Sequence, residues 1–234
     1  MYRLILQLPL IIFLHISGIF SDFEQDYEKA LTFLKDHKEL ILSSCTKYDS
    51  DTSVVVSVLF PELVRYSAFF DFFETKSLEL IYVLYGSDYA DFSIGSLQMK
   101  PSFVEKLETY MSDEPLLHNF SALTEYMDND PQAVRRERIE RLKSFDWQLT
   151  YINCFYHIVS LRFDDMQNAD NSDKIKFFAS AYNHGFDNDQ EKIREWSMKK
   201  TFPYGSKFPD NPYSYCDVSL DFYNNHFQEF IKTK

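Results

Sequence analysis

Hydrophobic residues recur every three or four positions along most of this chain, which is the spacing of one face of an α-helix. The segment 23–43 is typical, with Tyr27, Leu31, Leu34 and Ile41 on one side. Similar patterns predict further helices over residues 54–66, 69–85, 101–110, 132–163, 173–182, 189–199 and 219–231. We therefore expect a mainly α-helical fold.

Two segments lack this periodicity. Residues 87–100 are polar and irregular. They follow Gly86, a typical residue after a helix C-terminus, and precede Pro101, which suits the first turn of a helix. Residues 201–213 contain three prolines and predict a surface loop. The chain has no internal repeat, low-complexity tract or linker, so we expect one helical domain over residues 22–234.

The segment 54–66 is the least typical of the predicted helices. It begins with Val54, Val55 and Val56, three β-branched residues that also suit a buried strand. It contains Pro61, which kinks a helix or begins a new turn. We interpret the segment as a buried helix.

Charge and composition narrow the function classes. The chain has only five glycines, which favours helices over a β-sandwich. Its net charge of −12 makes it a poor binder of nucleic acid or of anionic membranes. The basic residues at the start of segment 132–163, among them Arg138 and Arg141, alternate with Glu137 and Glu140 at helical spacing. We therefore expect a solvated, ion-paired face there.

The N-terminus is typical of an export signal. Arg3 precedes an apolar run over residues 4–20, and the small residue Ser21 precedes the acidic Asp22. We expect residues 1–21 to be a signal peptide and the mature protein to be periplasmic or extracellular. A retained membrane anchor is the alternative, because the run is about as long as a short membrane span.

The cysteines and histidines give no sign of a metal site, because no spacing between them resembles that of zinc ligands. Cys154 lies in an apolar stretch, which predicts a buried thiol. Cys45 and Cys216 could form a disulfide in an oxidising compartment, and the sequence does not decide whether they do. The chain also lacks a glycine-rich loop that would hold phosphates. We expect no metal and no organic cofactor.

Three segments contain candidate chemistry. Glu62 closely follows the apolar run 54–60, and burial at that place would raise its pKa and suit it to donate a proton. The alternative is a surface glutamate paired with Arg65. The second segment, 91–101, contains Gly95, which permits close backbone approach, and Gln98, which offers a donor and an acceptor. Its alternative is a well-structured turn that leads into a helix. The third segment, 181–185, ends a predicted helix, and its alternative is an ordinary helix cap.

Together these segments resemble lytic transglycosylases and goose-type lysozymes, two families of the lysozyme-like superfamily. Those families carry a catalytic Glu at the end of a buried helix, then a Gly-Leu-x-Gln segment, then an Ala-Tyr-Asn-x-Gly segment. Residues 93–101 (SIGSLQMKP) are similar to the second element and residues 181–185 (AYNHG) to the third, in the same order. The resemblance covers residues 54–185. It departs at Leu63, at Ser96 and in the long spacing between Glu62 and Gly95, where residues 69–85 look like an inserted helix.

The resemblance implies a lysozyme-like helical domain that cleaves peptidoglycan glycan strands as a monomer, with Glu62 as the general acid. In a lytic transglycosylase the sugar's own hydroxyl is the nucleophile, whereas an inverting hydrolase needs a second carboxylate, for which Asp91 and Asp88 are the candidates. A turn-stabilising role is the alternative for Asp91. The expected substrate-binding residues are Ser93, Gly95, Gln98, Tyr182 and Asn183.

Two other interpretations stay open. In the first, the chain is a non-catalytic envelope protein of the same fold that binds glycan or a protein partner. In the second, it is a helical interaction protein whose motif matches arise by chance. Glu74 and Glu79 are the alternative acids if Glu62 is not the proton donor.

Overall fold

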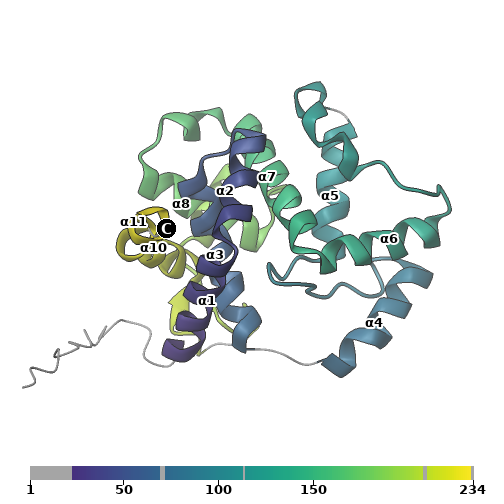
Figure 1. Ribbon diagram of the computed structural model, residues 1–234, viewed down its shortest axis with the longest axis horizontal. Coiled ribbons are helices and arrows are strands. Elements are labelled where there is room, and N and C mark those ends of the chain that lie inside the picture. Colours follow the sequence, from purple (N-terminus) through teal and green to yellow (C-terminus); the bar gives the residue numbers. More distant parts are fainter. Residues whose placement is uncertain (1–22, 69–71, 113, 208–209, 233–234) are drawn as a thin grey trace, which may run out of the picture.

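The computed structural model describes residues 23–68, 72–112, 114–207 and 210–232 (Figure 1). The chain is mainly helical, as predicted. In order, its elements are α1 (Glu24–Asp36), α2 (Lys38–Tyr48), α3 (Thr52–Ala68), α4 (Phe72–Tyr85), α5 (Pro101–Ser112), η2 (Pro115–Leu123), α6 (Pro131–Lys143), α7 (Phe145–Arg162), η3 (Asp164–Asn168), α8 (Asn171–His184), α9 (Gln190–Trp196), β1 (Lys200–Phe202), β2 (Tyr213–Ser214), α10 (Tyr215–Asn225) and α11 (Phe227–Lys232).

The predicted export signal, residues 1–21, lies outside the described residues. Within the described ranges, no helix is both long enough and apolar enough to cross a membrane.

The helices form two groups that α7 joins. Figure 1 shows α3 among α1, α8 and α10, while α4, α5 and α6 lie on the other side of α7. Helix α7 contacts α2, α3 and α8 in the first group and α5 and α6 in the second. The irregular segment between α4 and α5 therefore starts and ends in the second group.

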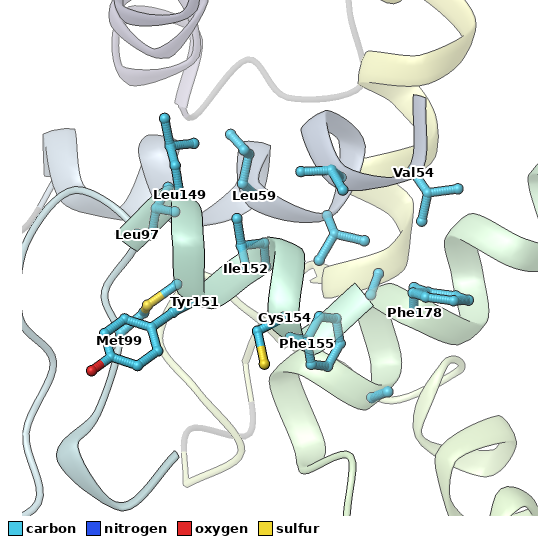
Figure 2. Packing of buried hydrophobic residues seen from close by; sticks show 14 of the residues in the cluster. Val54, Leu59, Leu97, Met99, Leu149, Tyr151, Ile152, Cys154, Phe155 and Phe178 are labelled. Atoms are coloured by element: carbon cyan, nitrogen blue, oxygen red, sulfur yellow. The ribbon is translucent and has the colours of Figure 1, made fainter. Parts of the chain in front are cut away.

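Helix α3 is apolar on all sides because it is buried on all sides. Val54, Val55 and Val56 are fully buried, and Pro61 lies inside the helix without ending it. The prediction of a buried helix is confirmed, and the strand alternative is wrong. Figure 2 shows Leu59 of α3 beside Ile152 of α7, in the main hydrophobic core.

Three predicted helices are each divided in two. Segment 23–43 breaks at His37, segment 132–163 at Ser144, and segment 219–231 at His226. Ser144 has extended backbone angles (φ −89°, ψ 123°), whereas a continuous helix would need helical ones. Each break consists of a single non-helical residue, which takes the place of one ordinary helical position of about 100°. The spacing of hydrophobic residues therefore looks nearly continuous across the break.

The proline-rich segment 201–213 is mostly irregular, as predicted, but its two ends pair. β1 and β2 form a short antiparallel sheet immediately before α10. This pairing holds Thr201 and Phe202 in the interior, and both are buried.

The expectation of a solvated basic face on α6 is wrong for two residues. Arg138 and Arg141 are buried. The guanidinium of Arg138 lies 2.6 Å from Glu108 of α5 and 2.7 Å from the Tyr82 hydroxyl of α4. Arg141 donates to the backbone carbonyl groups of Ala122 and Leu123. Arg138 therefore ties α4 and α5 to α6, and Arg141 ties η2 to α6, because each guanidinium needs partners once it leaves water.

Candidate active site

Glu62 lies in α3 directly after the buried apolar run, and only 4% of its surface is exposed. Burial raises the pKa of its carboxyl group. The charge of Arg65, hydrogen bonding with Tyr215 and the charge of Lys100 each lower that pKa, but burial has the largest effect. Arg65 Nη1 lies 3.1 Å from Glu62 Oε1. Glu62 is therefore both buried, as predicted, and paired with Arg65, as in the alternative interpretation.

Arg65 is held in place by groups other than Glu62. Its Nε donates to the Pro203 carbonyl at 3.0 Å and its Nη2 to the Thr201 carbonyl at 3.4 Å. The guanidinium also lies 5.4 Å from the ring centres of Phe202 and Tyr215. The sheet segment around β1 thus fixes the cation that faces the carboxylate.

Two tyrosines lie close to Glu62. Burial raises the pKa of both Tyr182 and Tyr215, and the negative charge of Glu62 raises each of them further. The Tyr182 hydroxyl donates to the Leu97 carbonyl, and the Tyr215 hydroxyl donates to the Val58 carbonyl, both at 2.9 Å. Through Tyr182, the third predicted segment contacts the second segment beside the first.

The second segment forms a tight hairpin over residues 94–99, which we call the 94–99 hairpin. Ile94 and Met99 exchange backbone hydrogen bonds of 2.9 and 3.1 Å. Gly95 and Gln98 have positive φ angles of 68° and 48°. The Gln98 side chain donates to the Gly95 carbonyl at 2.9 Å, so its amide nitrogen closes the turn. This nitrogen is thus engaged within the hairpin, and the role of Gln98 in substrate binding stays a prediction.

Gln148 of α7 holds this hairpin, and the sequence interpretation missed it. It is fully buried, its Nε2 donates to the Ile94 carbonyl at 2.8 Å, and its Oε1 accepts from the Leu97 amide at 3.2 Å. A Cβ atom at Gly95 would lie 2.4 Å from the Leu142 carbonyl oxygen and 2.5 Å from Gln148 Nε2. The close backbone approach predicted for Gly95 is confirmed. An amide side chain within the apolar part of segment 132–163 was the available signal for Gln148.

Asp91 lies in the irregular segment before α5, and its side chain contacts the first turn of that helix. Its carboxylate accepts hydrogen bonds from the Ser102 amide at 3.1 Å and the Ser102 hydroxyl at 2.8 Å. Lys100 Nζ is 3.8 Å away. These contacts are those of a turn-stabilising residue, the alternative role for Asp91. Ser93, two residues further on, is exposed.

Asn183 is held by two elements that follow it in the chain. Its Oδ1 accepts hydrogen bonds from Trp196 Nε1 at 2.9 Å and from the Thr201 hydroxyl at 3.3 Å. Neither partner was a sequence candidate. Because Thr201 also contacts Arg65, Asn183 belongs to the surroundings of Glu62.

Glu79, one of the two alternative acids, is engaged in ion pairs. Glu79 lies 3.1 Å from Lys143 and 3.9 Å from Lys76, on the side of α4 that faces α6. The side chain of Glu74 lies outside the described residues.

The thiols and metal-binding side chains do not form a site where the structure describes the chain. All three cysteines are buried and free. The prediction of a buried Cys154 is confirmed, and the open pairing of Cys45 with Cys216 is not made. Cys216 Sγ instead lies 3.1 Å from the Ser180 hydroxyl. Among the described residues, no group of three or more His, Cys, Asp or Glu side chains is placed to hold a metal ion.

Comparison with known proteins adds no relative: no protein-family model, no curated protein and no solved structure matches the chain. The candidate site therefore consists of one buried carboxylate, its arginine partner, two neighbouring tyrosines and the 94–99 hairpin, defined by their own contacts.

Proposed function

We propose that this protein cleaves the glycan strands of peptidoglycan, with Glu62 as the general acid and base. One observation carries the proposal. The three segments that resemble the motifs of lytic transglycosylases, far apart in the chain, meet around a single buried carboxylate. Tyr182 contacts Leu97 at 2.9 Å, and the charge of Glu62 acts on Tyr182. Chance motif matches give no reason for this convergence.

The surroundings of Glu62 suit both halves of a proton transfer. Because burial raises its pKa, the carboxyl group holds its proton to a higher pH than an exposed glutamate does, and this proton is the one to be donated to the glycosidic oxygen. Once the proton has left, the carboxylate faces the guanidinium of Arg65 at 3.1 Å, and the positive charge of Lys100 also acts on it. These groups stabilise the charge that the step creates.

A single acid and base favours the lytic transglycosylase reaction over inverting hydrolysis. Inversion needs a second carboxylate about 6.5–9.5 Å away to activate water. Asp91, the first of the two candidates for that role, is engaged by Ser102 and Lys100. In the proposed reaction the glycosidic oxygen takes the proton of Glu62, its bond to the anomeric carbon breaks, and it leaves as a hydroxyl group of the departing sugar. The sugar's own hydroxyl then attacks the anomeric carbon, returns its proton to Glu62 and closes an anhydro ring.

The proposed substrate agrees with the expected export of the chain, since peptidoglycan lies outside the cytoplasm. We propose that the mature protein works there as a monomer, without a metal or organic cofactor. The experiment incubates the purified mature protein with a peptidoglycan suspension and identifies the released fragments by mass spectrometry. We expect clearing of the suspension and anhydro-sugar ends.

The matched variant is Glu62→Gln, which keeps the size and hydrogen-bonding reach of the side chain but removes the transferable proton. A positioned general acid contributes about 10²–10⁴-fold to a rate, so the loss should be of at least that order. Cleavage at the wild-type rate by this variant would remove Glu62 from the mechanism.

A second candidate function is glycan binding without cleavage. Glu62 is 4% exposed and ion-paired with Arg65, so a bound sugar reaches it only if the protein rearranges. A wild-type protein that binds insoluble peptidoglycan but releases no fragments would favour this function.

A further inference from the structure

The orientation of the Asn183 side-chain amide is settled by its neighbour Trp196. An indole N–H can only donate a hydrogen bond, so the atom of Asn183 that lies 2.9 Å from Trp196 Nε1 is the amide oxygen. The Thr201 hydroxyl donates to the same oxygen at 3.3 Å. With the oxygen held by α9 and β1, the NH₂ group of Asn183 points away from both.

The same framework leads to Glu62. Thr201 is 2% exposed, and while its hydroxyl contacts Asn183, its backbone carbonyl accepts from Arg65 Nη2 at 3.4 Å. Arg65 Nη1 in turn lies 3.1 Å from Glu62 Oε1. Two residues, Thr201 and Arg65, thus connect Asn183 to the candidate acid.

The Asn183 NH₂ group is a donor that the fold leaves uncommitted. Asn183 is half-buried, and none of the hydrogen bonds found among the described residues uses this group. A half-buried amide with its oxygen fixed and its nitrogen free is suited to bind an oxygen atom of a ligand. Glycan strands offer hydroxyl and acetamido oxygens as acceptors.

We propose that Trp196 and Thr201 are positioning residues, which fix the Asn183 amide so that its NH₂ group donates a hydrogen bond to an oxygen of the bound glycan. This inference rests on the proposed function. It adds α9 and β1, outside the segments that the motif resemblance covers, to the substrate-binding machinery.

Conservative variants separate this role from simple packing. Trp196→Phe keeps an aromatic ring against His184, whose ring is stacked 3.9 Å from that of Trp196, but removes the indole N–H and one of the two fused rings. Thr201→Val removes the hydroxyl but keeps the backbone carbonyl that Arg65 uses. Trp147, the other tryptophan of the chain, packs on Arg141, so Trp147→Phe is the matched control.

The experiment measures binding of a soluble tetrasaccharide of N-acetylglucosamine and N-acetylmuramic acid, in the Glu62→Gln background that does not cleave it. We expect Trp196→Phe to raise the Kd roughly three- to tenfold, as expected for the loss of one neutral hydrogen bond. Thr201→Val should raise the Kd less, and Trp147→Phe should leave it unchanged.

A double variant tests whether Trp196 acts through Asn183. If it does, Trp196→Phe adds no further loss of binding once Asn183→Leu has removed the amide. With Glu62 intact, Trp196→Phe should raise KM more than it lowers kcat.

Two results would overturn the inference. The first is losses that multiply in the double variant, which would show that Trp196 has only a packing role. The second is wild-type affinity of Trp196→Phe in a background that binds the tetrasaccharide. Absence of tetrasaccharide binding by the Glu62→Gln protein itself would instead overturn the proposed function and this inference together.

Discussion

The Tyr182 hydroxyl donates a 2.9 Å hydrogen bond to the Leu97 carbonyl, across 85 positions of the chain. This bond joins the end of α8 to the 94–99 hairpin. It brings together the two motifs that resemble those of lytic transglycosylases, beside the carboxylate that the resemblance makes the acid. Predictions about the site therefore concern both its chemistry and the contacts that assemble it.

Glu62→Gln should change how stability depends on pH. Because burial raises the folded-state pKa of Glu62, the folded protein holds this proton more tightly than the unfolded chain. The contribution of this tightly held proton to the free energy of unfolding is fully present below the pKa of Glu62 in the unfolded chain, about 4.3. It is lost as pH rises through the pKa of Glu62 in the folded protein. Glutamine does not titrate, so the variant lacks this loss. Melting temperatures of both proteins between acid and neutral pH check it. Parallel curves would contradict a raised pKa.

Asp91→Asn should leave glycan cleavage within a few-fold of the wild-type rate. Asparagine keeps an oxygen that accepts from Ser102, and the proposed reaction needs no second carboxylate. Asp91→Ala should lower the free energy of unfolding by about 0.5–2 kcal/mol, as expected for a lost helix-start contact. Initial rates of fragment release and urea unfolding measure these effects. A rate loss of about 10²-fold or more in Asp91→Asn would identify Asp91 as the base of an inverting hydrolase.

Gly95→Ala should be strongly destabilising. The added Cβ would lie 2.4 Å from the Leu142 carbonyl oxygen, at a φ of 68°. Backbone strain and overpacking together cost about 2–5 kcal/mol. Gly205→Ala is the matched control, because Gly205 also has a positive φ but nothing within 4 Å of an added Cβ. The control should lose only about 1–2 kcal/mol. Equal losses in the two variants, measured by urea unfolding, would contradict the close approach.

Gln148→Leu should lower the free energy of unfolding by about 1–3 kcal/mol, because the buried Leu97 amide loses its acceptor. The Ile94 carbonyl keeps its bond from the Met99 amide. The same change at the exposed Gln132 should stay within about 0.5 kcal/mol of wild type. Thermal unfolding of both variants checks the comparison. Wild-type stability of Gln148→Leu would mean that the hairpin does not depend on this side chain.

Reducing agent should leave the melting temperature unchanged, because all three cysteines are free and buried. A thiol reagent should modify them only as the protein unfolds. A disulfide between Cys45 and Cys216 would instead make the oxidised protein more stable, by about 2–5 kcal/mol. Melting curves with and without reductant distinguish the two cases.

The sequence predicts those parts of the molecule that depend on local pattern. The start of α5 at Pro101 and the end of α4 at Tyr85 follow from residues whose backbone preferences act locally. The burial of Glu62 follows from the length of the apolar run before it. The breaks at His37 and Ser144 leave the hydrophobic spacing nearly unchanged, so the pattern does not reveal them.

Partners that are distant in the chain account for most of the remainder. Gln148 binds Leu97 across 51 positions, and the burial of Arg138 depends on Glu108 in another helix. Trp196 binds Asn183 through a single indole N–H, and nothing in the local sequence distinguishes this side chain from an ordinary aromatic residue. Such contacts exist only once the helices have packed.

The close approach at Gly95 gives the molecule a mechanical property. The 94–99 hairpin contacts Leu142 at the end of α6 and Gln148 in the first turns of α7, on both sides of the break at Ser144. Any change in the angle between these two helices would displace the hairpin and disrupt its hydrogen bond with Tyr182. The 94–99 hairpin is therefore held rigidly against both helices. The rearrangement that gives a sugar access to the buried Glu62 therefore has to take place in the segments that face this hairpin.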